Sequence, residues 1–393
     1  MKVFKGEIAM SATNNKLKIL LKVVLLGACA CVGATTCAAT YTWKADENGN
    51  WDGNITDPAH WECDTADQSG YPQSKNDVIN IPEGVKTKIT INSSHESGKW
   101  VLLNSCHVTF VSAVDAIGDT AQMNVKELQM KAGATFVLNS AKILNDSAMA
   151  FPNGSTGIVH NASSLRCGNV NLHDGLSSAY IEVAGKSTLN AGNIYIGDGN
   201  KLVIDDSTVI CRARLALGTY SYANRVNSTT IVRFKGREPK LLFYDDTNAN
   251  GKNLQVSLSN STMEGDVLNF EFLIPEEGFA SAPIAIAEGN TSTRLFATTW
   301  DSDKTKPYYG LFRFKILEES PAVLCCRKVN QKLVEWTLRG ENEEGFCRDA
   351  MEEGIPPKKA REQTFSFEEP TENHFIYSVL LDCRPTGFKV IVR

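Results

Sequence analysis

The sequence has little positive charge for its length, and its basic residues form no run. Lysine and arginine number 40 against 45 aspartate and glutamate residues, which gives the 393-residue chain a formal net charge of −5. Nucleic acids and anionic lipid surfaces select proteins with basic patches. Nucleic acids and anionic lipid surfaces are therefore not expected partners. We also do not expect the chain to be an integral membrane protein once its leader is removed.

The motifs of several common chemistries are also missing. The chain contains no C-x-x-C pair, and its six histidines form no H-E-x-x-H pattern or other close metal pair, so a zinc site is not expected. It contains no G-x-S-x-G, P-loop or G-x-G-x-x-G sequence either. Because none of these motifs occurs, motif searching identifies neither a ligand nor a reaction for this chain.

Residues 1–39 have the composition of a secretory signal peptide. Basic residues up to Lys22 precede an apolar run over 23–34, which is too short to span a bilayer and is followed by small residues up to Ala39. We expect cleavage near Ala39, with lipidation at Cys29 as the alternative. Cleavage removes five lysines and one glutamate, so the mature chain has 35 basic and 44 acidic residues. We expect it outside the cell or at the cell surface, with the periplasm as an alternative.

What the sequence does contain is a repeat of 21 residues, because the segments 179–199 and 200–220 align along their whole length. The aligned apolar pairs are Ile181 with Leu202, Val183 with Ile204, Leu189 with Ile210, Ile194 with Leu215, and Ile196 with Leu217. A third copy lies 24 residues upstream, where 168–172 repeats as 192–196. Apolar residues alternate within each row and turn residues separate the runs, which is the periodicity of short strands.

Repeats of this length made only of short strands predict an all-β chain that forms a right-handed parallel β-solenoid (β-helix), with one row per coil. At about 22 residues per coil, we expect about nine coils over 78–275. After Pro275, prolines and acidic loops interrupt the chain, and 276–393 is expected to hold the terminal strands and a C-terminal cap. Two predicted strands there, over 375–382 and 388–392, flank a Pro-Thr-Gly hairpin signal.

Aromatic motifs concentrate in 40–77, ahead of the first predicted coil. They are Tyr41-Thr42-Trp43, Gly49-Asn50-Trp51, Asp57-Pro58-Ala59-His60-Trp61, Tyr71-Pro72 and Asp77-Val78-Ile79-Asn80-Ile81. Their order resembles the opening of secreted bacterial proteins with autotransporter-associated β-strand repeats, which are passenger-like β-helices. Those proteins usually have asparagine where this chain has His60. The resemblance implies adhesion, surface display or envelope structure.

Two roles are open for Trp43, Trp51 and Trp61. The first coil of a solenoid exposes an apolar end and an open strand edge, and buried indoles would cover both as an N-terminal cap. Alternatively, the three rings form a platform on which an extracellular polysaccharide or another cell-surface component stacks. Burial is the commoner fate of tryptophan, so we favour the cap.

One metal site is suggested by the sequence, a calcium loop after Tyr244. Asp246, Asn248 and Asn250 fit the first half of the pattern, in which alternate oxygens converge and a glycine permits the turn. The twelfth position holds Ser257 instead of a bidentate glutamate. A plain Asn/Gly turn without metal is therefore the alternative, and no other cofactor is expected.

Eight cysteines follow the leader, and they fall into two groups. Wide spacing in the first group predicts scattered, buried ladder positions at Cys63, Cys106, Cys167 and Cys211. In an exported protein the second group could form two disulfides of undecided connectivity. Its members are Cys325, Cys326, Cys347 and Cys383.

Catalysis on a β-helix would need acids and bases that converge on one face of neighbouring coils. Arg212 and Arg214 with Asp205 and Asp206 are the nearest arrangement, and charges on an exposed solenoid face are usually only solvated. We therefore expect a non-enzymatic protein, with a polysaccharide-active enzyme and a carbohydrate-binding module as alternatives. A strip of aligned acids and bases would favour the enzyme, and a row of exposed aromatic rings the binding module.

Overall fold

The protein is known from a computed structural model, which describes 38–65, 70–113, 120–174, 178–197, 199–217, 229–244, 254–258, 267–273, 275, 280, 283–287, 296–297, 311–316, 326–327, 361–371 and 374–382. The chain divides into two compact units, Met1–Ala38 and Ala39–Arg393. All the strands among the described residues lie in the second unit. Among the described residues, the one helix is a 3-10 turn, η1 (Pro58–His60), and none is long and apolar enough to cross a membrane.

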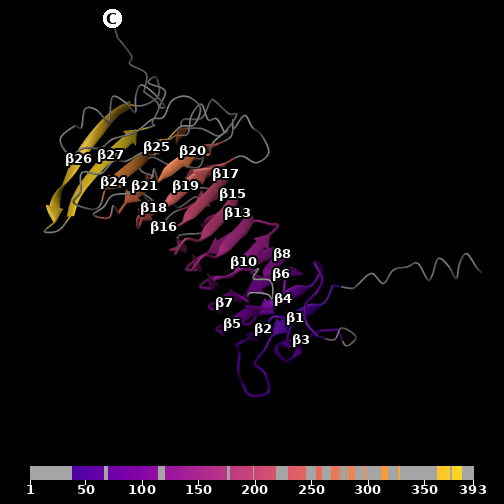
Figure 1. Cartoon of the computed structure of the whole chain (residues 1–393). Helices are drawn as coiled ribbons and strands as arrows, with labels where there is room; N and C mark the ends of the chain where they lie inside the picture. The colour runs from indigo at the N-terminus through magenta and orange to yellow at the C-terminus, as the bar shows by residue number, and fades with distance from the viewer. Residues whose placement is uncertain are drawn as a thin grey trace, which may run out of the picture. The chain divides into compact units, whose positions relative to one another are not determined.

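The strands form two sheets, which we name sheet A and sheet B (Figure 1). Sheet A contains β1 (Thr40–Trp43), β3 (Trp61–Cys63), β4 (Val78–Ile81), β6 (His95–Leu102), β8 (Gln122–Met130), β10 (Lys142–Asn145), β11 (Met149–Pro152), β13 (Ser164–Asp174), β15 (Thr188–Ile196), β17 (Thr208–Leu217), β19 (Lys240–Phe243), β20 (Gln255–Leu258), β22 (Ile284–Ile286), β23 (Phe296–Ala297) and β25 (Cys326–Arg327). Sheet B contains β2 (Gly53–Asn54), β5 (Lys86–Ile91), β7 (His107–Ser112), β9 (Thr135–Asn139), β12 (Thr156–His160), β14 (Tyr180–Ala184), β16 (Lys201–Asp205), β18 (Thr229–Lys235), β21 (Val267–Phe272), β24 (Leu311–Ile316), β26 (Arg361–Thr371) and β27 (His374–Asp382).

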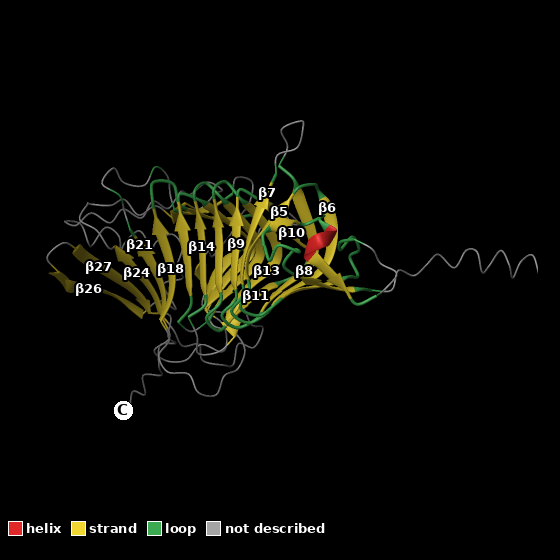
Figure 2. Ribbon diagram, turned by 90° about the horizontal axis from the view of Figure 1, so that it is seen from below, coloured by secondary structure: helices red, strands yellow, loops and turns green. Residues whose placement is uncertain are grey.

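Apart from the antiparallel pairs β1–β3, β24–β27 and β26–β27, neighbouring strands within each sheet come from successive rows of the sequence and run parallel. In sheet A, β13 pairs with β15 and β15 with β17; in sheet B, β12 pairs with β14 and β14 with β16. The chain thus alternates between the sheets as it proceeds, and Figure 2 shows the resulting rows of strands. This is the stacking of a β-solenoid, so the predicted all-β class is confirmed.

The long strands of sheet A have two arms. β10 pairs with the first part of β13 and β11 with its last part, and β19 and β20 divide β17 in the same way. Gly168 and Gly192 lie between the arms of β13 and β15, and a Cβ on Gly192 would lie 2.2 Å from the Gly168 carbonyl oxygen. Only glycine lets the backbones approach this closely, so the glycines repeated in the sequence mark the bend.

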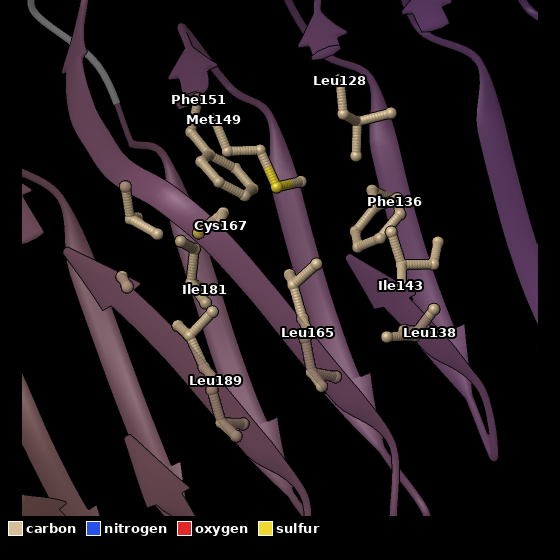
Figure 3. Close-up of a cluster of buried hydrophobic side chains, with 14 of the residues drawn as sticks. Leu128, Phe136, Leu138, Ile143, Met149, Phe151, Leu165, Cys167, Ile181 and Leu189 are labelled. Carbon is tan, nitrogen blue, oxygen red and sulfur yellow. The ribbon is translucent and has the colours of Figure 1, made fainter. Parts of the chain in front are cut away.

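Inward side chains stack as apolar ladders between the sheets. Val170, Ile194 and Leu215 occupy one such ladder, and each is almost completely buried. Figure 3 shows the cluster formed by neighbouring coils, in which Phe136 and Phe151 fill space between the aliphatic ladders. Alternation of apolar and polar residues, which predicted the strands, follows from this burial because successive side chains point to opposite faces.

The predicted alignment of the two 21-residue rows is right at most positions, but at Leu189 it is wrong by one residue. Ile181 pairs with Leu202 and Ile194 with Leu215, as expected, but Leu189 pairs with Val209 instead of Ile210. The register shifts between Ala191 and Asn193, where β17 accommodates an extra residue as a bulge. The bulge compensates for a turn that is one residue shorter before β17, which a gap-free alignment cannot detect.

The last described strands reverse direction. The strand predicted over 375–382 is confirmed as β27, which pairs antiparallel with both β24 and β26. Its predicted hairpin partner at 388–392 lies outside the described residues, and β26 was not anticipated from the sequence.

Candidate functional site

The aromatic motifs of 40–63 meet at the end of sheet A. The segment Pro58-Ala59-His60 forms η1 because the carboxylate of Asp57, which caps it, accepts a hydrogen bond from the Ala59 amide (3.0 Å) and proline suits the first helical position. This turn buries the His60 ring, which stacks on Trp43 with centroids 4.8 Å apart and planes 9° from parallel. His60 is therefore a packing residue.

Two of the three tryptophans, for which a buried cap was favoured over sugar binding, are inside the core. Trp43 and Trp61 are 0% and 5% exposed, and their rings meet edge to face at 4.7 Å. The Trp43 indole donates hydrogen bonds to the Trp51 carbonyl (2.8 Å) and the Thr87 hydroxyl (3.1 Å), and the Trp61 indole donates to the Ile55 carbonyl (2.8 Å). Their polar atoms are thus satisfied within the protein, and neither ring offers a free face to a sugar.

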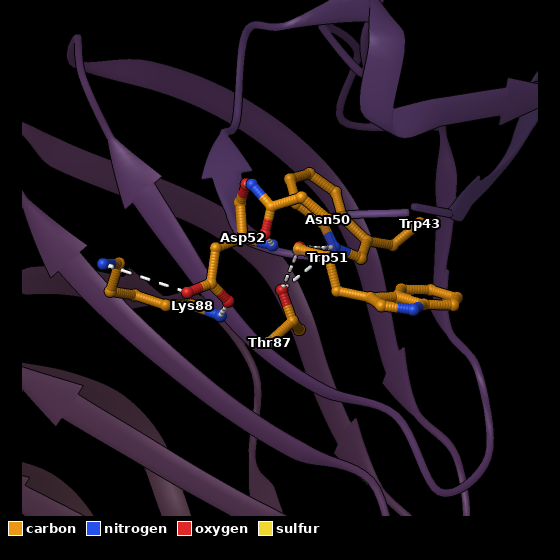
Figure 4. Close-up of polar contacts among 6 residues, drawn as sticks. All are labelled: Trp43, Asn50, Trp51, Asp52, Thr87 and Lys88. Atoms are coloured by element: carbon orange, nitrogen blue, oxygen red, sulfur yellow. Dashed lines mark hydrogen bonds and ion pairs between the residues drawn. The ribbon is translucent and has the colours of Figure 1, made fainter. Parts of the chain in front are cut away.

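Trp51 lies at the edge of this cluster and is partly buried against it. Figure 4 shows how its loop is held: the Thr87 hydroxyl donates to the Trp51 carbonyl (2.6 Å), and the Asp52 carboxylate accepts from the Lys88 amide (2.7 Å). The loop is therefore fastened to β5. Contact between Trp51 and a glycan stays a prediction.

Strand β3 is the last strand of sheet A in the sheet order, and it runs against the direction of the stack. It pairs antiparallel with β1 through Tyr41–Cys63 and Trp43–Trp61, whereas β1 pairs parallel with β4. Asp77 fastens the adjoining segment, because its carboxylate accepts hydrogen bonds from the amides of Ser74 (2.9 Å) and Gln73 (3.2 Å). A terminal strand of three residues leaves only a short open edge.

The proposed metal ligands Asp246, Asn248 and Asn250 lie outside the described residues, so the calcium loop stays a prediction. Within the part of the chain that the structure describes, no group of three or more His, Cys, Asp or Glu side chains could hold a metal ion. Cys63, Cys106, Cys167 and Cys211 are free thiols, and all except the half-buried Cys63 are buried, as their spacing predicted.

Three of the charged residues considered for catalysis make contacts in different parts of the fold. Asp205 in β16 pairs with Lys235 (3.0 Å), and Asp206 accepts from the amide of Glu238 (2.8 Å). Arg212 belongs to sheet A, where its guanidinium donates to the Cys167 carbonyl (2.7 Å). Each of these three contacts holds the scaffold together.

A charged network on the outward side of sheet B was not anticipated from the sequence. Lys235 pairs with both Glu182 (3.1 Å) and Asp205 (3.0 Å), and the Tyr180 hydroxyl donates to Glu182 (2.7 Å). Beside it, Arg233 pairs with Glu271 (2.6 Å). The partners in these ion pairs are 30 or more residues apart and become neighbours only through the coil register, so a linear scan for motifs misses them.

Burial and hydrogen bonding act in opposite directions on Glu182. Burial raises the pKa of its carboxyl, but the hydrogen bonds from Tyr180 and Lys235 outweigh it and leave the pKa below its ordinary value. Burial also lowers the pKa of Lys201, assisted by the nearby Arg233 guanidinium. The lowered pKa of Glu182 keeps its carboxylate charged beside Lys235, which is typical of a structural ion-pair network.

The architecture places the chain in the class of β-solenoids. No protein-family model matches the chain, and neither a curated protein nor a solved structure does. The resemblance of the opening motifs to autotransporter-associated β-strand-repeat proteins therefore stays a prediction.

Proposed function

We propose that this chain is an exported β-solenoid with a non-enzymatic role at the cell surface or outside the cell, in adhesion, surface display or envelope structure. The observation that carries the proposal is the packing of the N-terminal aromatic motifs. Trp43, His60 and Trp61 form an interior cluster next to the short antiparallel strand β3, which supports a structural cap. A stack closed in this way presents its long sides to partners.

Several finer features belong to the same proposal. The solenoid is right-handed, has about nine coils, and ends in an N-terminal cap over 40–77 and a C-terminal cap within 276–393. The paired strands β26 and β27, which turn away from the parallel direction at the far end of sheet B, support the second cap. The resemblance to passenger-like repeat proteins supports surface display.

Export is tested by expressing the full chain in a Gram-negative host and determining the N-terminus of the product by mass spectrometry. We expect a mature chain that begins near Thr40 and is found outside the cytoplasm. A chain that lacks residues 1–39 is the control, and it should stay in the cytoplasm. A cytoplasmic product with its leader intact would contradict export, and lipid attached to Cys29 would contradict the cleavage site.

A further inference from the structure

Three strands of sheet A, β13, β15 and β17, carry asparagine, arginine and tyrosine side chains on their outward face. The set, which we name the amide–arginine strip, consists of Arg166, Asn169 and Asn171 on β13, Asn190, Asn193 and Tyr195 on β15, and Arg212 and Arg214 on β17. These residues alternate with buried ones such as Leu165, Ile194 and Leu215, so they lie on the opposite face from the core.

The strip follows the bend between the arms of the strands. Gly168 and Gly192 contribute no side chain there, and the Arg212 guanidinium donates a hydrogen bond to the Cys167 carbonyl at 2.7 Å. Because Cys167 pairs with Ala191 and Ala191 with Cys211, this contact crosses β15 completely. The strip is therefore continuous over three coils.

Side-chain amides in the strip form an ordered row. The Asn169 carbonyl oxygen accepts from both the backbone amide (2.9 Å) and the side-chain amide (2.8 Å) of Asn193, one coil further on. The amide oxygens of Asn171 and Asn190 are buried, and no donor among the described residues forms a hydrogen bond with either. Buried acceptors without donors are uncommon in proteins, and a change of side-chain rotamer that turns these amides outward would let ligand hydroxyl groups satisfy them.

The charge of the strip is opposite to that of the whole chain. The segments 164–172, 188–196 and 208–217 contain three arginines and no aspartate or glutamate, whereas the chain as a whole carries −5. Arg214 is half-buried; burial lowers its pKa, and the neighbouring Tyr195 raises it. Arginine at a partly desolvated position binds carboxylates with paired, charge-assisted hydrogen bonds.

We propose that the amide–arginine strip binds an acidic polysaccharide built of uronic acids. Arginines would pair with the uronate carboxylates, asparagine amides would bind the ring hydroxyls, and Tyr195 would pack against a sugar face. Successive coils rise by about 4.8 Å, close to the length of one pyranose in an extended polymer, so neighbouring sugars would meet equivalent rungs. The inference rests on the proposed export, because such polymers lie outside the cytoplasm.

The test measures binding of the purified chain to soluble polygalacturonate by titration calorimetry, with dextran as the neutral polymer and single-stranded DNA as a different polyanion. The test variant is Arg166→Gln with Arg214→Gln. The matched control is Lys86→Gln with Lys131→Gln, which changes the net charge equally at two exposed positions away from the strip. Thermal melting confirms that each variant is folded, and Arg166→Gln alone replaces the pair if the double variant does not fold.

We expect polygalacturonate to bind, dextran and DNA to bind much more weakly, and the arginine pair to raise the Kd at least tenfold while the lysine pair changes it less than twofold. No binding of polygalacturonate, equal losses in the two pairs, or DNA binding as tight as polygalacturonate binding would overturn the proposal. Absence of binding by a correctly exported chain would leave the proposed function standing. Release of unsaturated or reducing ends from the bound polymer would instead contradict the non-enzymatic role.

Discussion

At the scale of single residues, the bend of sheet A depends on glycine. A methyl group at Gly192 would lie 2.2 Å from the Gly168 carbonyl oxygen, so the backbone of one coil would have to move. Gly84 is a useful comparison because it has a φ of +68° but no atom within 4 Å of an added Cβ. Alanine substitution at the two sites therefore distinguishes the cost of steric overlap, at Gly192, from the cost of a left-handed backbone conformation, at Gly84.

We predict that Gly192→Ala lowers the free energy of unfolding by about 3 kcal/mol, the upper range for overpacking. Gly84→Ala should cost only about 1 kcal/mol, the price of a left-handed alanine. Urea denaturation of both variants measures the difference. Equal losses would show that the coils are not in close contact at Gly168 and Gly192.

The buried thiols give a second prediction at this scale. Burial raises the pKa of Cys167 and Cys211 to about 12. At pH 8 the thiolate fraction of such a group is on the order of 10⁻⁴, and the thiolate is the reactive form. We predict that a maleimide labels Cys63 first in the native protein and that it labels Cys167 and Cys211 only after unfolding in urea. Peptide mass spectrometry locates the label, and rapid native labelling of Cys211 would place it outside the core.

Inward residues were predictable from the sequence where the rows keep their spacing. Ile194 and Leu215 were matched correctly because both rows have the same length between the bend and the end of the strand. Leu189 was matched to the wrong partner because a shorter turn and a bulge cancel in the total row length. Burial of Trp43 was the favoured prediction, but its stacking on His60 and its hydrogen bond to Thr87 were not predictable, because no local pattern encodes them.

At the scale of elements, serine hydroxyls connect the turns of adjacent coils. The Ser163 amide donates to the Ser187 hydroxyl (3.1 Å), and the Ser187 amide donates to the Ser207 hydroxyl (3.0 Å). All three residues are buried, so these contacts satisfy backbone groups that sheet pairing does not reach. The three serines are visible in the sequence, but the hydrogen bonds between them depend on the coil register.

Strands β14, β16 and β18 are also joined by the charged network of Glu182, Asp205 and Lys235. The folded-state pKa of Glu182 is below its ordinary value, so its contribution to stability is present above the unfolded pKa of about 4.3 and is lost as the pH falls through the folded pKa. Solvent screening reduces this contribution because the pair is partly exposed, and we expect about 1 kcal/mol or less.

We therefore predict that the free energy of unfolding falls less between pH 5 and pH 3 in Glu182→Gln than in the parent chain, by at most about 1 kcal/mol. Chemical denaturation at several pH values measures this. Glu238→Gln changes an exposed carboxylate that forms no ion pair with any residue the structure describes; it is the control and should keep the parent profile. A Glu182→Gln profile identical to that of the parent would contradict the stabilising role of the network.

At the scale of the whole molecule, the described strands form a stack in which each coil contacts mainly its neighbours. Paired residues in successive coils are separated by only 20 to 24 positions in the central rows. Such a stack was predictable because the segments 179–199 and 200–220 repeat the same apolar pattern. The amide–arginine strip and the sheet B network were not, because both arise from residues that only the stacking brings together.

The central claim is that the coils stack in parallel at a fixed register, which positions both the aromatic end and the strip. Cysteine pairs test it most directly, because Cα atoms of paired parallel strands lie about 4.8 Å apart and a shift of two residues along the strand exceeds the reach of a disulfide. The paired positions are Thr90 with Val111 in sheet B and Thr188 with Thr208 in sheet A. The displaced controls, on the same faces, are Thr90 with Thr109 and Thr188 with Ile210.

Mass spectrometry of cross-linked peptides after mild oxidation provides the measurement. We predict that the two paired variants form the engineered disulfide almost completely and that the two displaced variants do not form it. Displaced pairs that cross-link as well as the paired ones would contradict the stacking register and, with it, the strip of residues that we propose binds acidic polysaccharide.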